Sequence, residues 1–174
     1  LETLGISGGN SARSTGGMNA AGTPAQDENE FGESAGVEKT LETAASTYAD
    51  NETITALAAT VAEQWAAYQE NPEGYFDSVE LMELDTMIGG KGINNPELVA
   101  TLCANSADTI AWLSTIGIEL PSVSSLGGAS VKRIHRPLND EGQVISVGAY
   151  MVPILQQNCE DLGDALRLRM NKAR

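Results

Sequence analysis

Apolar side chains recur at helical spacing through the middle of the chain, and this pattern limits the fold more than any other feature of the sequence. Between residues 37 and 70 they repeat at intervals of three and four, which is typical of helices that bury one face. The pattern breaks at Asp50 and Asn51, and asparagine is a favoured residue at a helix N-terminus. We therefore expect two helices, over residues 37–49 and 52–70, packed as a hairpin.

The same spacing predicts three further helices. Ser78 precedes a run that ends at Gly89–Gly90, and Asn95–Pro96 opens a second run that continues to Gly117. Serine, asparagine and proline are typical of helix starts, and glycine is typical of helix ends. The third run covers residues 147–162. The segment 95–117 is thus expected to form the longest helix of the chain.

Extended structure is expected only in short segments. Residues 131–137 follow a glycine pair and end at Pro137, which predicts a small strand, and residues 166–170 alternate as a half-buried strand does. Residues 1–23 show neither helical nor strand periodicity, so we expect a loop there. Residues 24–36 are acidic and contain Pro and Gly, so we expect a solvated connector. The fold is predicted to be predominantly α-helical with a few short strands.

Charge and composition exclude several classes of partner. With 24 acidic against 10 basic side chains the formal charge is -14, so nucleic acid is not expected as a partner. No apolar run is long enough to span a membrane. Cys103 and Cys159 have the spacing of neither a disulfide framework nor a zinc site, and we interpret them as small buried hydrophobes. Because the chain opens on Leu1 without a basic leader, we expect a processed chain or an internal fragment, and the compartment stays open between cytoplasm and cell envelope.

Two glycine pairs near the start of the chain are the best candidates for chemistry. Gly8–Gly9 and Gly16–Gly17 are joined by residues with small hydroxyl and amide side chains. Without a Cβ the main chain can approach a flat or phosphorylated ligand closely, and its N–H groups can then act as donors. The alternative is a flexible Gly/Ser loop with no ligand.

This segment, residues 8–19, resembles the flavin-contact segment of the fumarate reductase and flavocytochrome c flavoprotein family, the succinate dehydrogenase/fumarate reductase type of FAD-dependent oxidoreductase. Three further segments resemble the same family in the same order, at residues 84–99, 112–117 and 127–137. The resemblance covers residues 1–23 and about 76–174. It implies an α/β fold in which an FAD-binding Rossmann-like domain carries a capping domain.

The resemblance also divides the chain into four segments. Residues 1–23 correspond to the flavin-contact loop of the FAD-binding domain, and residues 76–126 to helices of the capping domain. Residues 127–174 correspond to a return to the FAD-binding domain. Residues 24–75, an acidic linker and a helical hairpin, depart from the family pattern and are interpreted as an insertion of unknown role.

Six positions are carried over from the family as cofactor contacts. Glu2 corresponds to the acidic residue that binds the ribose hydroxyls, although an ordinary surface glutamate is an equal alternative. The other five are expected on the flavin nucleotide (Asn10, Ser11) or beside its ring (Thr15, Gly16, Gly17). Gly16 is also expected near the dicarboxylate substrate.

The basic residues are weaker candidates. Arg13 offers a phosphate or carboxylate ligand, with a solvated arginine as the favoured alternative. His135 lies between Arg133 and Arg136, whose charges favour its neutral form, and a structural role is favoured over acid–base catalysis. Lys132, Arg133 and Arg136 are candidates to hold an anionic cofactor or substrate on charge alone.

The resemblance implies that the parent protein reduces the double bond of fumarate or a related unsaturated carboxylate, by hydride transfer from flavin N5. An electron-donor domain or protein would supply electrons to the flavin. The sequence contains neither a G-x-G-x-x-G fingerprint nor the segments that supply the family's substrate histidines and catalytic arginine, so the chain alone is expected to be inactive. Two alternatives stay open: a flavoenzyme of the same fold acting on urocanate or a ketosteroid, and a non-catalytic helical binding module over residues 37–116.

Overall fold

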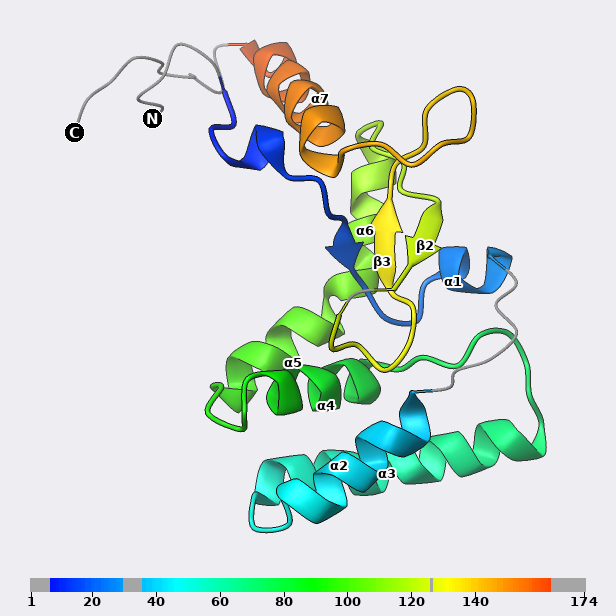
Figure 1. Ribbon diagram of the computed structural model, residues 1–174. Coiled ribbons are helices and arrows are strands. Elements are labelled where there is room, and N and C mark those ends of the chain that lie inside the picture. Colours follow the sequence, from blue (N-terminus) through cyan, green and yellow to red (C-terminus); the bar gives the residue numbers. More distant parts are fainter. Residues whose placement is uncertain (1–6, 30–35, 126, 164–174) are drawn as a thin grey trace.

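The computed structural model describes residues 7–29, 36–125 and 127–163, and helices dominate it (Figure 1). The helices are η1 (Ser11–Arg13, a short 3-10 helix), α1 (Pro24–Glu28), α2 (Val37–Thr47), α3 (Glu52–Glu70), α4 (Val79–Gly89), α5 (Pro96–Ala104), α6 (Ser106–Thr115) and α7 (Val147–Asp161). The strands are β1 (Met18–Asn19), β2 (Ser122–Ser124) and β3 (Ile134–Arg136). The predicted mainly helical fold with a few short strands is confirmed.

A small antiparallel sheet joins the start of the chain to its later part. The strand order is β1-β3-β2, and His135 in the central strand lies opposite both Met18 and Val123. The pairing continues past β1, because the N–H of Ala20 donates to the carbonyl of Arg133 at 3.1 Å. The glycine-rich loop that precedes β1 is therefore held beside residues more than a hundred positions further on.

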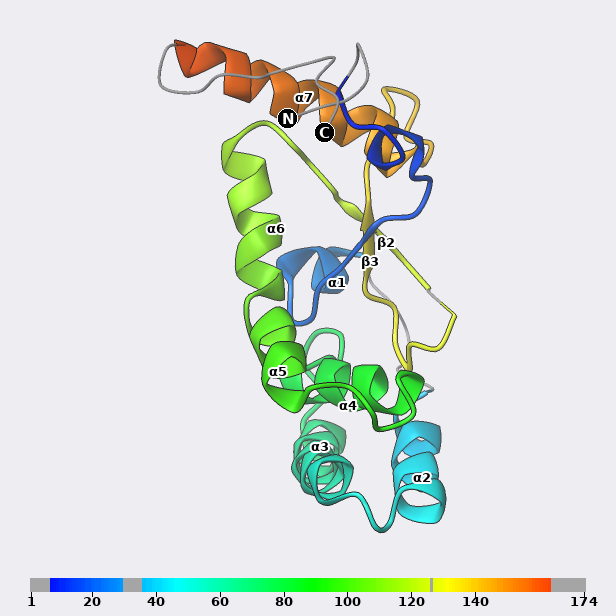
Figure 2. The same ribbon diagram turned by 90° about the vertical axis from the view of Figure 1, so that its left-hand side faces the viewer.

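Most of the helices lie beyond the two ends of this sheet, and α6 runs alongside it (Figures 1 and 2). The α2–α3 hairpin lies at one end, α4 and α5 lie between it and the sheet, and α7 lies at the other end. One hydrophobic cluster joins α2 to α5 around Ile54, Leu81 and Leu84, and a second joins α6 and α7 around Ile118 and Val147. The hairpin thus shares a core with α4 and α5.

The predicted helix starts are confirmed by their caps. The side chains of Asn51, Ser78 and Asn95 each accept a hydrogen bond from the backbone N–H three residues later, at 3.0, 3.1 and 3.0 Å. Such caps satisfy one of the donors that the first turn of a helix leaves unpaired. The helix expected over residues 147–162 is observed as α7, and the strand expected within residues 131–137 is observed as β3.

The single helix predicted over residues 95–117 is wrong. Two helices, α5 and α6, meet at Asn105. The hydroxyl of Ser106 explains the break, because it donates to the carbonyl of Cys103 at 2.8 Å and accepts the buried N–H of Ala21 at 3.2 Å. The apolar spacing does not register this break, since it depends on a partner 85 residues away.

The predicted connector over residues 24–36 is wrong in its first part, which forms α1. Gln26 is buried there, and its amide donates to Asp77 at 2.7 Å and to the carbonyl of Lys132 at 2.9 Å. Its carbonyl also accepts the N–H of Thr23 at 3.0 Å, which closes the first turn. The acidic composition misled the prediction because one buried amide anchors the segment. The strands β1 and β2 were not predicted, since residues 1–23 were expected to be loop, and the strand expected over residues 166–170 lies outside the described residues.

No described helix combines the length and the apolar character needed to cross a membrane.

Candidate functional site

The glycine-rich loop curls back on itself before it enters the sheet. The N–H groups of Ser11 and Ala12 donate to the carbonyl of Gly8, at 2.8 and 3.3 Å, and that of Ser14 donates to Ser11 at 3.2 Å. These N–H groups are used inside the loop, so Ser11 presents its exposed side chain rather than its backbone. Asn10 is exposed at the start of η1, and its side chain makes no capping bond.

One glycine of each pair is required by packing. Gly8 has a left-handed backbone with φ of +99°, and a Cβ there would lie 2.7 Å from Cγ1 of Val152 in α7. A Cβ on Gly17 would overlap the carbonyl oxygen of His135 in β3 and lie 2.6 Å from Ile134. Close approach of the main chain to neighbouring elements therefore explains Gly8 and Gly17 without any ligand.

Gly16 has no such explanation. A Cβ at this position would meet no atom of the described residues within 4 Å, and the φ of Gly16 lies outside the left-handed region that favours glycine. The residue is exposed, with open space where a side chain would stand. A flat ring can lie against the main chain here, and any larger side chain would occupy the same space.

The carbonyl groups beside Gly16 each accept hydrogen bonds from specific donors. The carbonyl of Ser14 accepts from the hydroxyl of Ser146 at 2.6 Å and from a backbone N–H at the start of α7 at 2.9 Å. The guanidinium of Arg136 donates to the carbonyl of Thr15 at 2.6 Å and to that of Gly16 at 3.4 Å. All three carbonyl oxygens are thus bound by the later part of the chain.

The N–H groups of the same peptides are left as donors. All described peptide bonds are trans, so each N–H points away from the carbonyl of its own peptide. The N–H groups of Thr15, Gly16 and Gly17 therefore point away from the groups that bind the preceding carbonyls. Within the described residues none of the three has an acceptor. Three consecutive donors beside an open surface suit a flat ring with acceptor atoms along its edge, as the isoalloxazine of a flavin has.

The predicted contacts therefore separate into three groups. Asn10, Ser11, Thr15 and Gly16 are exposed on one short loop, as a cofactor contact requires. Gly17 is half-buried, and strand packing accounts for its lack of a side chain. Glu2 lies outside the described residues.

A buried ion-pair cluster lies between this loop and the helices, and the sequence did not reveal it. Arg133 binds Asp77 through Nη2 at 2.7 Å and Asp85 through Nη1 at 2.6 Å, and all three side chains are at most 7% exposed. Burial raises the pKa of the Asp77 carboxyl; burial alone would lower the pKa of Arg133, but the two carboxylates outweigh it and raise that pKa. The hypothesis that Arg133 holds an anionic ligand is wrong, because its guanidinium is already paired with two buried carboxylates of the chain itself.

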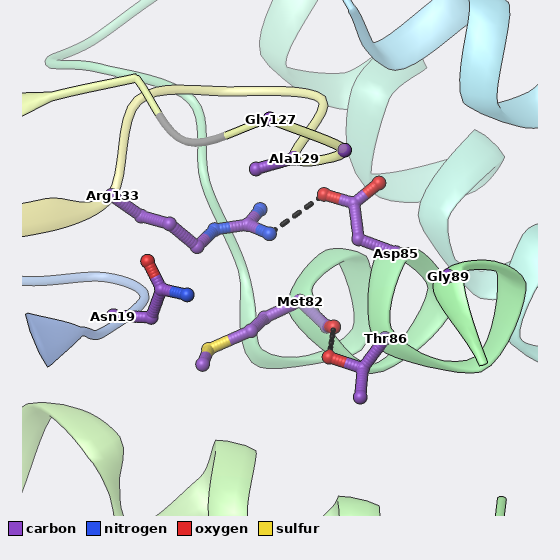
Figure 3. Close-up of a pocket in the computed structure, with 9 residues that line it drawn as sticks. Asn19, Met82, Asp85, Thr86, Gly89, Gly127, Ala129 and Arg133 are labelled. Carbon is purple, nitrogen blue, oxygen red and sulfur yellow. Dashed lines mark hydrogen bonds and ion pairs between the residues drawn. The ribbon is translucent and has the colours of Figure 1, made fainter. Parts of the chain in front are cut away.

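A small cavity opens beside this cluster (Figure 3). It has a volume of about 170 Å³ and lies between β1, α4 and the loop that contains Gly127. Figure 3 shows the side chains of Asn19 and Met82 on one side of Arg133 and that of Asp85 on the other. Asp85 also accepts hydrogen bonds from the N–H and the hydroxyl of Ser130, at 2.9 and 2.7 Å. It thereby anchors the loop that contains Gly127 to α4.

His135 is fully buried in β3 and has a structural role. Its Nδ1 lies 2.9 Å from the carbonyl of Arg133 and 3.3 Å from that of Met18, and since carbonyls only accept, Nδ1 carries the proton. Nε2 then accepts the hydroxyl of Thr23 at 2.6 Å. Burial lowers the pKa of His135, so burial rather than the flanking arginines keeps the ring neutral.

We expect this histidine to make the stability of the fold depend on pH. Because its folded-state pKa lies below the ordinary value of 6.5, the unfolded chain binds the extra proton more readily. The contribution of His135 to the free energy of unfolding is fully present above pH 6.5. It falls, by up to about 1.4 kcal/mol per pH unit, as the pH drops toward the folded-state pKa. Urea unfolding at about pH 7.5 and about pH 5.5 measures this loss. The difference between the two pH values should shrink in His135→Gln, and an equal difference would contradict a buried neutral ring.

Cys103 offers no reactive thiol. Burial, with a smaller effect of Glu83, raises the pKa of the Cys103 thiol to about 11, and Cys159 is half-buried. Both are free, and no described group of His, Cys, Asp and Glu side chains has the arrangement of a metal site.

Comparison with known proteins identifies relatives of this chain. No protein-family model matches the chain. A fumarate reductase (cytochrome) of Shewanella frigidimarina is 42% identical over 103 residues, which is 59% of this chain and 17% of that protein. An NADH:acrylate oxidoreductase of Vibrio harveyi is 32% identical over 158 residues, 82% of this chain and 16% of that protein. The chain thus spans only a small part of the length of these relatives.

The comparison of structures finds the same class of protein as the comparison of sequences. The open conformation of a flavocytochrome c3 fumarate reductase superimposes with a TM-score of 0.65 and 28% sequence identity, over 97% of this chain and 21% of that one. The expected resemblance and the expected α/β flavoprotein fold are both confirmed. In sequence and in fold, the chain is homologous to a segment of the fumarate reductases of the flavocytochrome c type.

Proposed function

We propose that the chain forms one wall of the flavin site of an FAD-dependent oxidoreductase that reduces the double bond of fumarate or a related unsaturated carboxylate. The observation that carries this proposal is the surface at Gly16. Among the described residues, nothing occupies the space where a Gly16 side chain would stand, and three neighbouring N–H groups have no acceptor. This surface coincides with the position that the family resemblance assigns to the isoalloxazine ring.

The residues of the loop would have separate tasks. The N–H groups of Thr15, Gly16 and Gly17 would bind acceptor atoms at the edge of the ring, and Asn10 and Ser11 would contact the nucleotide. Glu2 would bind the ribose. When bound, FAD would supply the hydride that reduces the substrate. Fixed donors of this kind need no reorganisation when negative charge develops on the ring.

The names of two relatives support a substrate class for this proposal. One relative is named for fumarate and another for acrylate, and both acids carry a double bond next to a carboxylate. We therefore propose an α,β-unsaturated carboxylate, with a dicarboxylate bound near Gly16 as the preferred case. The names also indicate different electron donors, a cytochrome and NADH, so the donor domain or protein of this chain is proposed only as a class.

The rest of the chain would support this wall. Residues 76–126 would belong to the capping domain that excludes water from the flavin. The α2–α3 hairpin packs on α4 in a shared core, so we propose that it stiffens the start of the cap rather than forming a separate module. The residues that clamp the substrate would come from other segments of the polypeptide, and the chain alone would not turn over fumarate.

A titration with FAD tests the proposal. We expect the purified chain to quench the fluorescence of FAD in a saturable way and to retain bound flavin through gel filtration, because the loop is already ordered by Arg136 and the start of α7. Riboflavin should bind more weakly, since it lacks the adenosine and pyrophosphate that Asn10 and Ser11 would contact. Absence of saturable binding by a folded chain would contradict the proposal.

A further inference from the structure

Arg136 is bound to the main chain of the glycine loop in an unusual way. It ends β3, and its guanidinium donates to two consecutive carbonyls, of Thr15 at 2.6 Å and of Gly16 at 3.4 Å. Its aliphatic stem packs on Gly17, where a Cβ would lie 2.9 Å from Cγ of Arg136. Within the described residues its charge has no carboxylate partner, in contrast to that of Arg133.

These contacts restrict the part of the loop that is otherwise free to rotate. A guanidinium holds its N–H groups in one rigid plane, so bonding to two carbonyls in series fixes the rotation of both peptides. Glycine has the widest range of backbone conformations, and no described residue lies within 4 Å of where a Gly16 side chain would stand. The directions of the Gly16 and Gly17 N–H groups therefore depend on Arg136.

We propose that Arg136 is a positioning residue that aims the N–H groups of Gly16 and Gly17 into the open space above Gly16 and keeps that surface electropositive. It acts through the backbone and touches no ligand itself. Its contribution to flavin binding rests on the proposed function, whereas its control of the two peptides is a property of the chain alone. A surface arginine that only extends the sheet would leave the two N–H groups where they are.

Spectra of the FAD-free chain test the first half of the inference. We would record ¹H–¹⁵N correlation spectra of the wild-type chain, Arg136→Gln, Arg136→Lys and the control Arg13→Gln, which alters an exposed arginine of η1. In Arg136→Gln the amide signals of Gly16 and Gly17 should shift and exchange with solvent faster. Lysine keeps the charge but is a single point donor, so Arg136→Lys should restore at most one of the two.

Two results would overturn the inference. One is an Arg136→Gln spectrum that is folded and unchanged at Gly16 and Gly17. The other is an equal change in Arg13→Gln, which would indicate a general effect of lost charge. Should Arg136→Gln fail to fold, the comparison of Arg136→Lys with the wild type decides the question, because full preservation of both amide signals in the lysine variant contradicts control by a two-carbonyl contact.

Adding FAD tests the second half. The amide signals of Thr15, Gly16 and Gly17 should move in the wild-type chain, and the FAD-induced shifts at Gly16 and Gly17 should be smaller in Arg136→Gln. If these wild-type signals do not respond to bound FAD, the proposed flavin contact is wrong at this loop. The FAD-free spectra would still decide the role of Arg136, so the two failures are distinguishable.

Discussion

Replacing Arg133 with methionine is expected to lower the free energy of unfolding by about 3–5 kcal/mol, the largest effect of any single substitution considered for this chain. The substitution leaves two carboxylates, Asp77 and Asp85, without their cation in a site where each is at most 7% exposed. Breaking a buried ion pair costs this much because a charge without a partner stays in a medium that solvates it poorly. A domain with a typical total stability of about 5–15 kcal/mol would lose much of it.

Urea unfolding followed by circular dichroism measures this loss, and two further variants make the measurement specific. Arg13→Met removes an exposed arginine and should change stability by no more than about 0.5 kcal/mol. The double variant Arg133→Met with Asp77→Asn should be more stable than Arg133→Met alone, because it removes one of the two unpaired charges. Equal unfolding midpoints for Arg133→Met and the wild type would contradict the buried cluster.

Local patterns predicted the elements of the fold well where the interactions are local. Helix caps such as Asn51 and Ser78 act on N–H groups three residues away, so the sequence alone reveals them. The errors in the helices have the opposite origin. Ser106 breaks the predicted long helix to bond Ala21, and Gln26 orders the predicted connector by bonding Asp77, which are partners 85 and 51 residues away. Neither periodicity nor composition contains information on such pairs.

The candidate site was predictable in part for the same reason. The glycine pairs and the family resemblance identified the loop. They did not reveal why each glycine is needed, because Gly8 packs against α7 and Gly17 packs against β3. Charge alone did not distinguish Arg133 from Arg136: the first is buried with two carboxylates, while the second holds the loop. Arg133 lies just before β3 and Arg136 at its end, three residues apart in an extended segment, so their side chains point to opposite sides and meet different neighbours.

Replacing Gly16 with leucine is expected to weaken FAD binding by about 10- to 100-fold, equivalent to about 1–3 kcal/mol, while leaving stability within about 0.5 kcal/mol of the wild type. The reason is that a Cβ at Gly16 would meet no atom of the described part of the chain, so the side chain can be built there without strain and a bound ring would compete for its space. Fluorescence titration with FAD and urea unfolding measure the two effects separately.

Gly17→Ala should lose stability, unlike Gly16→Leu, and this contrast is the decisive part of the experiment. Its Cβ would collide with the backbone of β3, so we expect a loss of about 1–3 kcal/mol in stability. Gly89→Ala, at an exposed helix end where a Cβ also meets nothing within 4 Å, should alter neither quantity and controls for adding a side chain in open space. If Gly16→Leu binds FAD as tightly as the wild type, the open surface at Gly16 does not receive the flavin ring, because no ring could share that space with a leucine.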